Sequence, residues 1–446
     1  MRMNQRLREH LADPSLPQRL HTLAEGAPGS ALISLTIDLG PGEQDWLNHL
    51  PGKAPYWYRA HPASGEFRLG IGQALHLSTS GPQRFAALSN AYTGLMQDWR
   101  HNGPVKAFLG FSFDENGGTI DLPSALLSVP ALLLESLAGR CRMTLTTSAA
   151  HIDEALGAWP QMLAHAAPRQ TLRWLPEADR TLAERAWVAR VNAARRDILQ
   201  GRLDKVVLAR SRQWQALSTI SARPLLEQLC AHQADACIYA FSQGESTFLG
   251  ATPERLVDFK GTQIESEALA GTAWPGSSAL EGSKNQHEQS LVVDAIIEAL
   301  APLCQSRPHA HPVEIHPAGR LTHLRSRITG QALKGTNLFD LLRVLHPTPA
   351  VGGYPTATAI DWLKAHGEQR SGWYSGGIGL LDGEGNGQIS VALRSALIQG
   401  NTISLQAGAG IVADSDPWQE LAETNAKLGT LLDALHDTQQ AGTKHA

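Results

Sequence analysis

The feature that most constrains the fold is a block of short apolar runs between residues 205 and 268, which turn residues separate. The runs cover residues 205–210, 236–241, 247–249, 255–259 and 263–268. Short apolar segments bounded by turn residues predict strands, and short connections join antiparallel neighbours. We therefore expect an antiparallel meander in this block.

Helices are predicted on both sides of the block. In the first, Val188, Val191, Ile198 and Leu199 form one apolar stripe, and Gly201 follows as a C-terminal cap. Hairpin turns are expected at residues 382–383 and 399–400, because a glycine follows a polar residue at each. Grouped helices and hairpins favour an α+β fold, one large unit of antiparallel sheets with flanking helices. Two further helices are predicted to begin near residues 283 and 337, and two more to cover residues 356–367 and 417–435. The other predicted strands cover residues 31–39, 105–113, 373–381, 387–398 and 402–407.

The distribution of polar residues divides the chain into parts with different expected roles. At 446 residues and 42% hydrophobic composition, the chain can bury a large core. Dense polar clusters crowd the part after residue 205. We therefore expect residues 1–175 to be a structural part of the fold, residues 176–438 to carry the chemistry, and residues 439–446 to form a tail.

Charge and hydropathy exclude several classes of protein. The formal net charge of −4 argues against a nucleic-acid binder, which would show a basic surface. No apolar run reaches the roughly 18 residues of a membrane span, and residues 1–23 lack the apolar core of a secretory signal. The 4 cysteines form no CxxC pair, so neither a disulfide framework nor a zinc site is expected. These features predict a cytoplasmic protein that acts on neither nucleic acid nor membranes.

Two residues are candidates for general acid–base catalysis. Lys205 opens an apolar strand, and its side chain is either an edge-strand cation kept in solvent or a desolvated amine that can accept a proton. Glu254 follows Pro253 in a turn between two predicted strands, so it projects from a rigid corner. The alternative for Glu254 is a simple ion pair with Arg255.

A second group of residues could bind a metal ion. Glu288 lies in line with the apolar stripe that continues at Val292, and a carboxylate in that position needs a cation or a donor. On the last helix, Glu420, Glu423 and Lys427 share one face, which is either solvated or the wall of a cleft. Carboxylates from two helices, together with waters, would suit Mg²⁺.

Further polar groups could hold an anionic ligand. Thr272 ends one predicted strand and Gly408 follows another. Both lie in glycine-containing segments, where exposed backbone N–H groups can bind a carboxylate. Tyr374 supplies a hydroxyl group on a predicted strand. Arg394 lies in an apolar run, where a guanidinium is costly to bury without an anion.

Nine ordered blocks of this sequence resemble the chorismate-utilising enzymes, over roughly residues 180–436. That family includes isochorismate, salicylate, anthranilate and aminodeoxychorismate synthases, and the resemblance is closest to the isochorismate synthases of menaquinone and siderophore pathways. It implies the fold of anthranilate synthase component I. The blocks are KVVLAR from Lys205, GATPERL ending at Leu256, ALAGTAWPG from Ala268, SKNQHEQSLV from Ser283, THLRSRITG from Thr322, LHPTPAVGGYP from Leu345, YSGGIG from Tyr374, VALRSALI from Val391 and AGAGIVADSDP from Ala407.

The resemblance also implies a role for each candidate. Lys205 would activate water as the base, and Glu254 would protonate the departing C4 hydroxyl as the acid. The implied cofactor is Mg²⁺, held by Glu288 and Glu423, with Glu420 acting through water. The implied substrate-binding residues are Thr272, His323, Ala350, Tyr374, Arg394, Gly408 and Lys427.

The branch of the family follows from two positions. Lys205 matches the water-using members and argues against anthranilate and aminodeoxychorismate synthases, which add ammonia and depend on a glutaminase partner. Ala350 stands where lyase-competent members tend to carry threonine. The resemblance therefore implies an isochorismate synthase that acts on chorismate without a glutaminase subunit. A salicylate synthase remains the first alternative, and an ammonia-using synthase the second.

Overall fold

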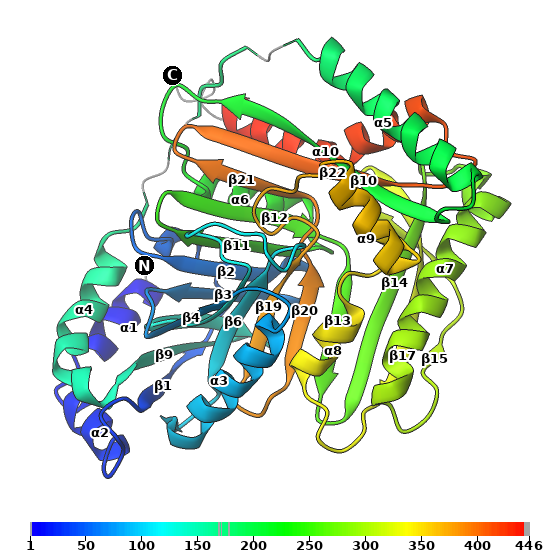
Figure 1. Ribbon diagram of the computed structural model, residues 1–446. Helices are drawn as coiled ribbons and strands as arrows, with labels where there is room; N and C mark the ends of the chain where they lie inside the picture. The colour runs from blue at the N-terminus through cyan, green and yellow to red at the C-terminus, as the bar shows by residue number, and fades with distance from the viewer. Residues whose placement is uncertain (1, 168–169, 171, 177–178, 441–446) are drawn as a thin grey trace.

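The computed structural model describes residues 2–167, 170, 172–176 and 179–440 (Figure 1). The predicted tail at 439–446 lies outside the described residues from 441 onward, and the last helix continues to Gln440. No helix among the described residues combines the length and the apolar character that crossing a membrane requires. The described helices are α1 (Arg2–Leu11), α2 (Leu16–Leu23), α3 (Arg84–Asp98), α4 (Ile152–Ala164), α5 (Thr181–Leu199), α6 (Arg223–His232), α7 (Ser283–Leu300), α8 (Leu338–Leu345), α9 (Thr356–Ala365) and α10 (Pro417–Gln440).

The larger of two sheets has 12 strands within the described residues. Its strands pair antiparallel, except that β1 and β5 are parallel. In spatial order they are β18 (Gly353–Tyr354), β10 (Lys205–Gln215), β22 (Thr402–Ile411), β21 (Ser395–Gln399), β12 (Ser246–Thr252), β11 (Cys237–Gln243), β2 (Tyr56–His61), β3 (Glu66–Ile71), β8 (Leu132–Leu137), β9 (Arg140–Ser148), β1 (Leu32–Pro41) and β5 (Arg100–His101).

The second sheet has 10 antiparallel strands in the described part of the chain. Each sheet contains one block of strands from before residue 175 and one block from after it, and the blocks pair at β11–β2 and at β19–β6, so the two parts of the chain form one body. In order, the strands are β15 (His309–Ala310), β17 (Leu321–Gln331), β14 (Gln263–Ala273), β13 (Arg255–Lys260), β20 (Gly387–Val391), β19 (Gly377–Asp382), β6 (Lys106–Phe111), β7 (Ala125–Val129) and β4 (Leu75–Thr79), with β16 (Glu314–Ala318) also paired to β17.

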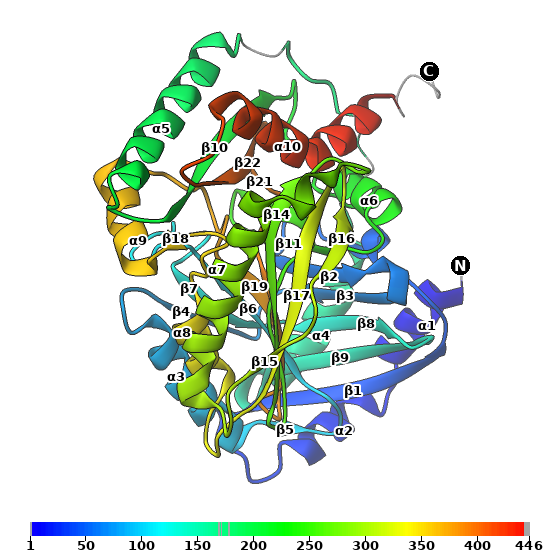
Figure 2. The same cartoon turned by 90° about the vertical axis from the view of Figure 1, so that its right-hand side faces the viewer.

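The two sheets pack face to face, and helices cover their outer faces. In Figure 2, β14 and β17 run from top to bottom while β1, β8 and β9 run across the view, so the sheets cross at a wide angle. An aromatic cluster fills the space between them: the rings of Phe108 on β6 and Phe241 on β11 stack with centroids 5.1 Å apart. Helices α3, α7 and α8 cover the smaller sheet, and α1, α2, α4, α6 and α10 cover the larger one. The layers confirm the predicted α+β unit with flanking helices.

The predicted meander over residues 205–268 is wrong. Strand β10 pairs with β22 and β18, both distant in sequence, while the hairpins β11–β12 and β13–β14 belong to different sheets. The chain changes sheet at Pro253 and Glu254, between β12 and β13. Proline has no backbone N–H to donate to a continuing ladder, which suits such a crossing. Local apolar patterning locates strands but does not encode their distant partners.

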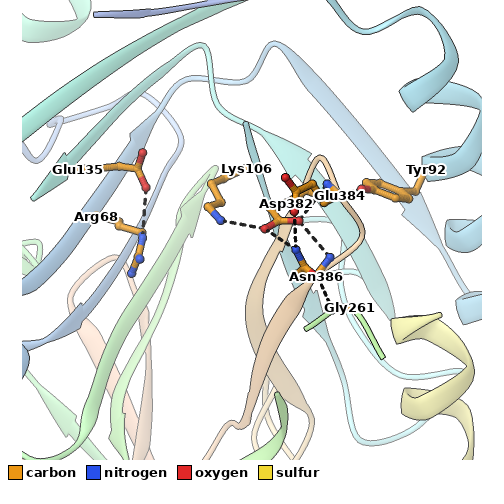
Figure 3. A network of polar contacts seen from close by, with 8 residues as sticks. All are labelled: Arg68, Tyr92, Lys106, Glu135, Gly261, Asp382, Glu384 and Asn386. Carbon is orange, nitrogen blue, oxygen red and sulfur yellow. Dashed lines mark hydrogen bonds and ion pairs between the residues drawn. The ribbon is translucent and has the colours of Figure 1, made fainter. Parts of the chain in front are cut away.

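The predicted hairpins at 382–383 and 399–400 are confirmed as β19–β20 and β21–β22. Asp382 organises the first turn, because its Oδ1 accepts the backbone N–H groups of Glu384 and Asn386, each at 3.0 Å (Figure 3). The Asn386 side chain in turn accepts the Gly261 N–H at 2.8 Å. The turn is thereby joined to the β13–β14 hairpin, which fixes the strands that lead to the site below.

Candidate active site

One cavity, between the two sheets and helices α7 and α10, is lined by nearly all of the predicted site residues. Figure 2 shows α7 along β14 and β17, and α10 at the end of the molecule beside β22. All the predicted site residues except Glu420 line this cavity, and every described lining residue lies between 205 and 427. Those brought together are Lys205, Glu254, Thr272, Glu288, His323, Ala350, Tyr374, Arg394, Gly408, Glu423 and Lys427.

Lys205 is a buried cation rather than an edge-strand lysine in solvent. It begins β10, and β18 covers that edge by pairing Tyr354 opposite Lys205. Its side chain is 1% exposed, and its Nζ lies 2.7 Å from Oε1 of Glu288 on α7. The two groups neutralise each other at the cavity wall, which offsets part of the desolvation cost of each.

Glu254 is a buried carboxyl group that favours its protonated form. It sits between β12 and β13 with 4% exposure, and its backbone oxygen accepts the Val391 N–H at 3.0 Å. Burial raises the pKa of Glu254 to about 8, and the negative charge of Glu267 adds to the increase, while Lys205 and Lys427 oppose it. A carboxyl group with this pKa carries a proton near neutral pH and can donate it.

The acidic face of α10 turns inward and is not solvated. Glu423 accepts the Lys427 ammonium at 2.6 Å, and Lys427 also donates to the Gly408 carbonyl at 2.9 Å. Burial alone would lower the pKa of Lys427, but the Glu423 carboxylate outweighs it and raises that pKa. Glu420, one turn earlier, is 2% exposed and is not among the residues that line the cavity.

Arg394 offers a guanidinium to a bound anion. It was expected within a strand, but 387–398 is broken: β20 ends at Val391, β21 begins at Ser395, and Arg394 lies between them at φ 48°. Its Nη1 donates to the Ala318 carbonyl at 2.9 Å. No carboxylate among the described residues lies within ion-pair distance of the Arg394 guanidinium. A substrate carboxylate would supply the negative charge that this cation lacks.

His323 positions that guanidinium. Its Nδ1 lies 3.2 Å from the Gly271 carbonyl, which fixes the proton on Nδ1 and leaves Nε2 to accept from Arg394 Nη2, also at 3.2 Å. Burial, followed by the charge of Arg394, holds the pKa of His323 well below its usual value. Thr272 lies 3.2 Å from the same Nδ1. His323 is therefore a neutral acceptor rather than a second cation.

Two glycines of β22 allow the side chains to meet. A Cβ at Gly410 would lie 2.6 Å from Glu288 Oε1 and 2.7 Å from Lys205 Cε, and one at Gly408 would lie 2.9 Å from the Tyr374 hydroxyl. These distances are too short for any side chain without a shift. The predicted strand over 373–381 begins only at Gly377, so Trp373, Tyr374 and Ser375 form a turn at the cavity.

Several lining residues were missed from the sequence. Gln406 lies in an apolar strand and accepts the Ser371 N–H at 3.0 Å, and a buried polar residue in such a run is the signal that could have found it. Ser375 has φ 60° and a buried hydroxyl, but neither feature leaves a trace in the sequence. Leu393 and Val207 complete the apolar part of the wall.

The carboxylates suit a hard divalent cation in number and type. Glu288 and Glu423 project into the same cavity from α7 and α10, and each holds a lysine ammonium. Groups of three or more acidic, histidine or cysteine ligands do not occur within the described residues. Two carboxylates completed by water and substrate oxygen atoms are the kind of set that Mg²⁺ uses. The residues present therefore fit that ion.

Comparisons with known proteins identify the family of the chain. A family model described as "Chorismate binding enzyme" matches residues 25–436. The chain is 35% identical over 408 residues to the salicylate biosynthesis isochorismate synthase of Pseudomonas aeruginosa, covering 86% of this chain and 85% of that protein. It is 33% identical to the isochorismate synthase MenF of Bacillus subtilis, with 75% of each chain covered.

Solved structures give the same result. The menaquinone-specific isochorismate synthase MenF of Escherichia coli superposes with a TM-score of 0.79 at 25% identity, covering 94% of this chain and 99% of that one. Anthranilate synthase component I of Streptococcus pneumoniae shares the fold, with a TM-score of 0.64 at 20% identity over 86% of this chain and 91% of that one. The predicted family and fold class are confirmed. The chain belongs to the chorismate-binding enzymes.

Proposed function

We propose that this chain isomerises chorismate to isochorismate, by adding water at ring carbon C2 and removing the hydroxyl group from C4. The observation that carries the proposal is that Glu254 and Lys205 line one cavity. Glu254 is a buried carboxyl group whose pKa is raised to about 8, and Lys205 is an amino group from a different strand. A proton donor and a proton acceptor in one cavity suit an exchange of hydroxyl groups between two ring carbons.

The proton transfers balance. Lys205, once neutral, takes a proton from water as the water oxygen bonds to C2. The ring double bonds shift, the C4–O bond breaks, and Glu254 donates its proton to the departing oxygen, which leaves as water. One water enters and one leaves, so the reaction is an isomerisation, and solvent water must return the proton from Lys205 to Glu254 before the next turnover. Each positioned proton transfer contributes about 10²–10⁴ in rate.

The other residues of the cavity bind and orient the substrate. Arg394, held by His323, would pair with a substrate carboxylate, and the backbone at Gly408 and the hydroxyl of Tyr374 would add donors beside it. Glu288 and Glu423 would hold Mg²⁺, with Glu420 acting through water. When bound, this ion would supply positive charge to a ring carboxylate. Because water is the nucleophile, no glutaminase partner is needed to supply ammonia.

The test is to incubate the purified chain with chorismate and Mg²⁺ and to separate the products by chromatography. Isochorismate as the main product supports the proposal. Salicylate with an equal amount of pyruvate would make the chain a salicylate synthase, and a product that requires ammonium ions would place it with the ammonia-using synthases. Lys205→Ala and Glu254→Gln should each abolish turnover. The matched control is Asp433→Ala, since Asp433 lies on α10 in an exposed pair with Arg320.

A further inference from the structure

A second cavity, of about 680 Å³, lies next to the catalytic one and has no part in the proposed reaction. It is enclosed by the start of α3, the loop after β6, the end of α8, helix α9 and the segment 368–372. Its volume falls within the roughly 300–1,000 Å³ range of small-molecule sites. Apolar side chains such as Phe113, Ile360 and Leu363 form one part of the wall, and charged side chains of both signs form another.

Three buried side chains with nitrogen atoms lie on this wall: Arg84, His346 and Arg370. The Arg84 guanidinium lies 5.7 Å from the centre of the Phe111 ring, and the His346 ring lies 5.0 Å from the same ring. The Phe113 ring lies 6.0 Å from the His346 ring and 3.7 Å from the Arg370 guanidinium. Arg370 is itself paired with the Glu368 carboxylate at 3.5 Å, so Arg84 is the cation of this group without a carboxylate in direct contact.

Arg84 is a buried cation with no carboxylate in direct contact, although the charges of Glu115 and Asp114 act on it from a greater distance. It is 4% exposed, and its hydrogen bonds run from Nη1 to oxygen atoms of Ser112, Asp114 and Ser124. Within the described chain, no carboxylate lies within 4.0 Å of its guanidinium. These two charges offset only part of the desolvation of Arg84, so an anion in direct contact with the guanidinium would stabilise it further. Arg394 in the catalytic cavity is likewise buried with no carboxylate in direct contact.

His346 supplies an acceptor beside these cations. Its Nε2 donates to the Ser375 carbonyl at 3.0 Å, so the neutral ring leaves a lone pair on Nδ1. Burial, with the nearby charge of Arg84, lowers the pKa of His346 to about 3 and keeps the ring neutral. In the described part of the structure this buried Nδ1 has no partner. A hydroxyl group of a ligand is the donor that such a site accepts.

We propose that this second cavity binds a small ring carboxylate that carries a hydroxyl group, with the carboxylate on Arg84, the ring against Phe113 and the hydroxyl on Nδ1 of His346. Arg370 also donates to the carbonyls of Val207 and Val351, each at 2.9 Å, and both residues line the catalytic cavity. The two cavities therefore share a wall. For this reason Arg84, which has no contact with the catalytic wall, is the residue to change.

The test is calorimetric titration of the purified chain with 3-hydroxybenzoate, without chorismate or metal, so it requires no turnover, and the variants distinguish binding in this cavity from binding in the catalytic one. We expect Arg84→Gln to weaken binding at least about tenfold, because a hydrogen bond to a charged group is worth about 1.5–3 kcal/mol. Ile360→Trp should weaken it as well by filling the cavity from α9, where the side chain is half-buried and replaceable. Benzoate, which lacks the hydroxyl group, should bind more weakly than 3-hydroxybenzoate.

Arg394→Gln is the matched control, because it removes the buried guanidinium of the other cavity and should leave the Arg84-dependent binding unchanged. Circular dichroism checks that each variant is folded, and Ile360→Trp keeps the test decisive if Arg84→Gln does not fold. Binding that survives Arg84→Gln and Ile360→Trp but is lost in Arg394→Gln would overturn the proposal, as would no binding at millimolar probe. Equal affinity for benzoate would overturn the assignment of the hydroxyl group to His346.

Discussion

Lys205 Nζ lies 2.7 Å from Glu288 Oε1, so the proposed base and a proposed metal ligand form an ion pair with each other. An ammonium has no lone pair with which to accept a proton, so Lys205 must lose its proton before it can act as the base. If Glu288 bound a divalent cation, that ion and the Lys205 ammonium would share one carboxylate. The pair thus couples the proposed metal site to the proposed base.

The first prediction concerns the energy of this pair in the presence of EDTA. Glu288→Ala leaves an uncompensated ammonium at a side chain that is 1% exposed, and we expect a loss of about 3–5 kcal/mol in the free energy of unfolding. The double variant Lys205→Ala/Glu288→Ala should be less destabilised than the sum of the single variants, by roughly 1 kcal/mol or more. Urea denaturation at pH 7 measures all four proteins. Strict additivity would show that the two groups do not interact.

The second prediction concerns the metal. Chelation by EDTA should abolish turnover, and Mg²⁺ should restore it and also raise the melting temperature. Binding at a hundred times Kd stabilises a fold by about 2.7 kcal/mol. Glu423→Ala should remove the thermal shift, whereas Asp433→Ala on the same helix should keep it. Full turnover in EDTA, or a thermal shift that survives both Glu288→Ala and Glu423→Ala, would contradict the assignment.

The third prediction concerns pH. The pKa of Glu254 is raised to about 8, so the protonated donor is present below that pH and is lost as pH rises through it. The kcat/KM for chorismate should therefore fall on the alkaline side of about 8. The same shift favours the folded state below the usual carboxyl pKa, and this contribution is lost as pH rises to about 8.

A variant outside the cavity can test that assignment. Glu267 lies on β14, away from the cavity wall, and its negative charge helps to raise the pKa of Glu254. Glu267→Gln removes this charge, so the alkaline fall in kcat/KM should move to lower pH while turnover on its acidic side is retained. An unchanged profile in this variant would show that the fall in activity belongs to another group.

Much of this site could be predicted from the sequence because its residues stand in local motifs with local causes. Pro253 fixes the corner that carries Glu254, and helical spacing aligns Glu423 with Lys427. What the sequence could not predict is the set of distant contacts. The pairing of β10 with β22, which brings Gly410 against Lys205, joins segments about two hundred residues apart. Nor does an apolar run reveal that Arg394 interrupts a strand at positive φ, since that conformation depends on the surrounding packing.

The last prediction concerns Ala350, which decides the product if the proposed reaction is correct. Its side chain lines the catalytic cavity in the turn closed by the Val351 N–H and the Thr348 carbonyl at 3.1 Å. A methyl group there offers no hydrogen bond to the enolpyruvyl end of the substrate, so isochorismate should be released intact. Ala350→Thr adds one hydroxyl group, and a hydrogen bond in a closed site is worth about 0.5–1.5 kcal/mol. That is at most roughly tenfold in a partition ratio, so the variant should release some pyruvate and salicylate without becoming an efficient lyase.

Pyruvate measured beside isochorismate for both proteins is the test, and Ala350→Ser, which supplies the hydroxyl without the added methyl group, separates the effect of the hydrogen bond from the effect of side-chain volume. Substantial pyruvate from the unmodified chain would place it with the salicylate synthases.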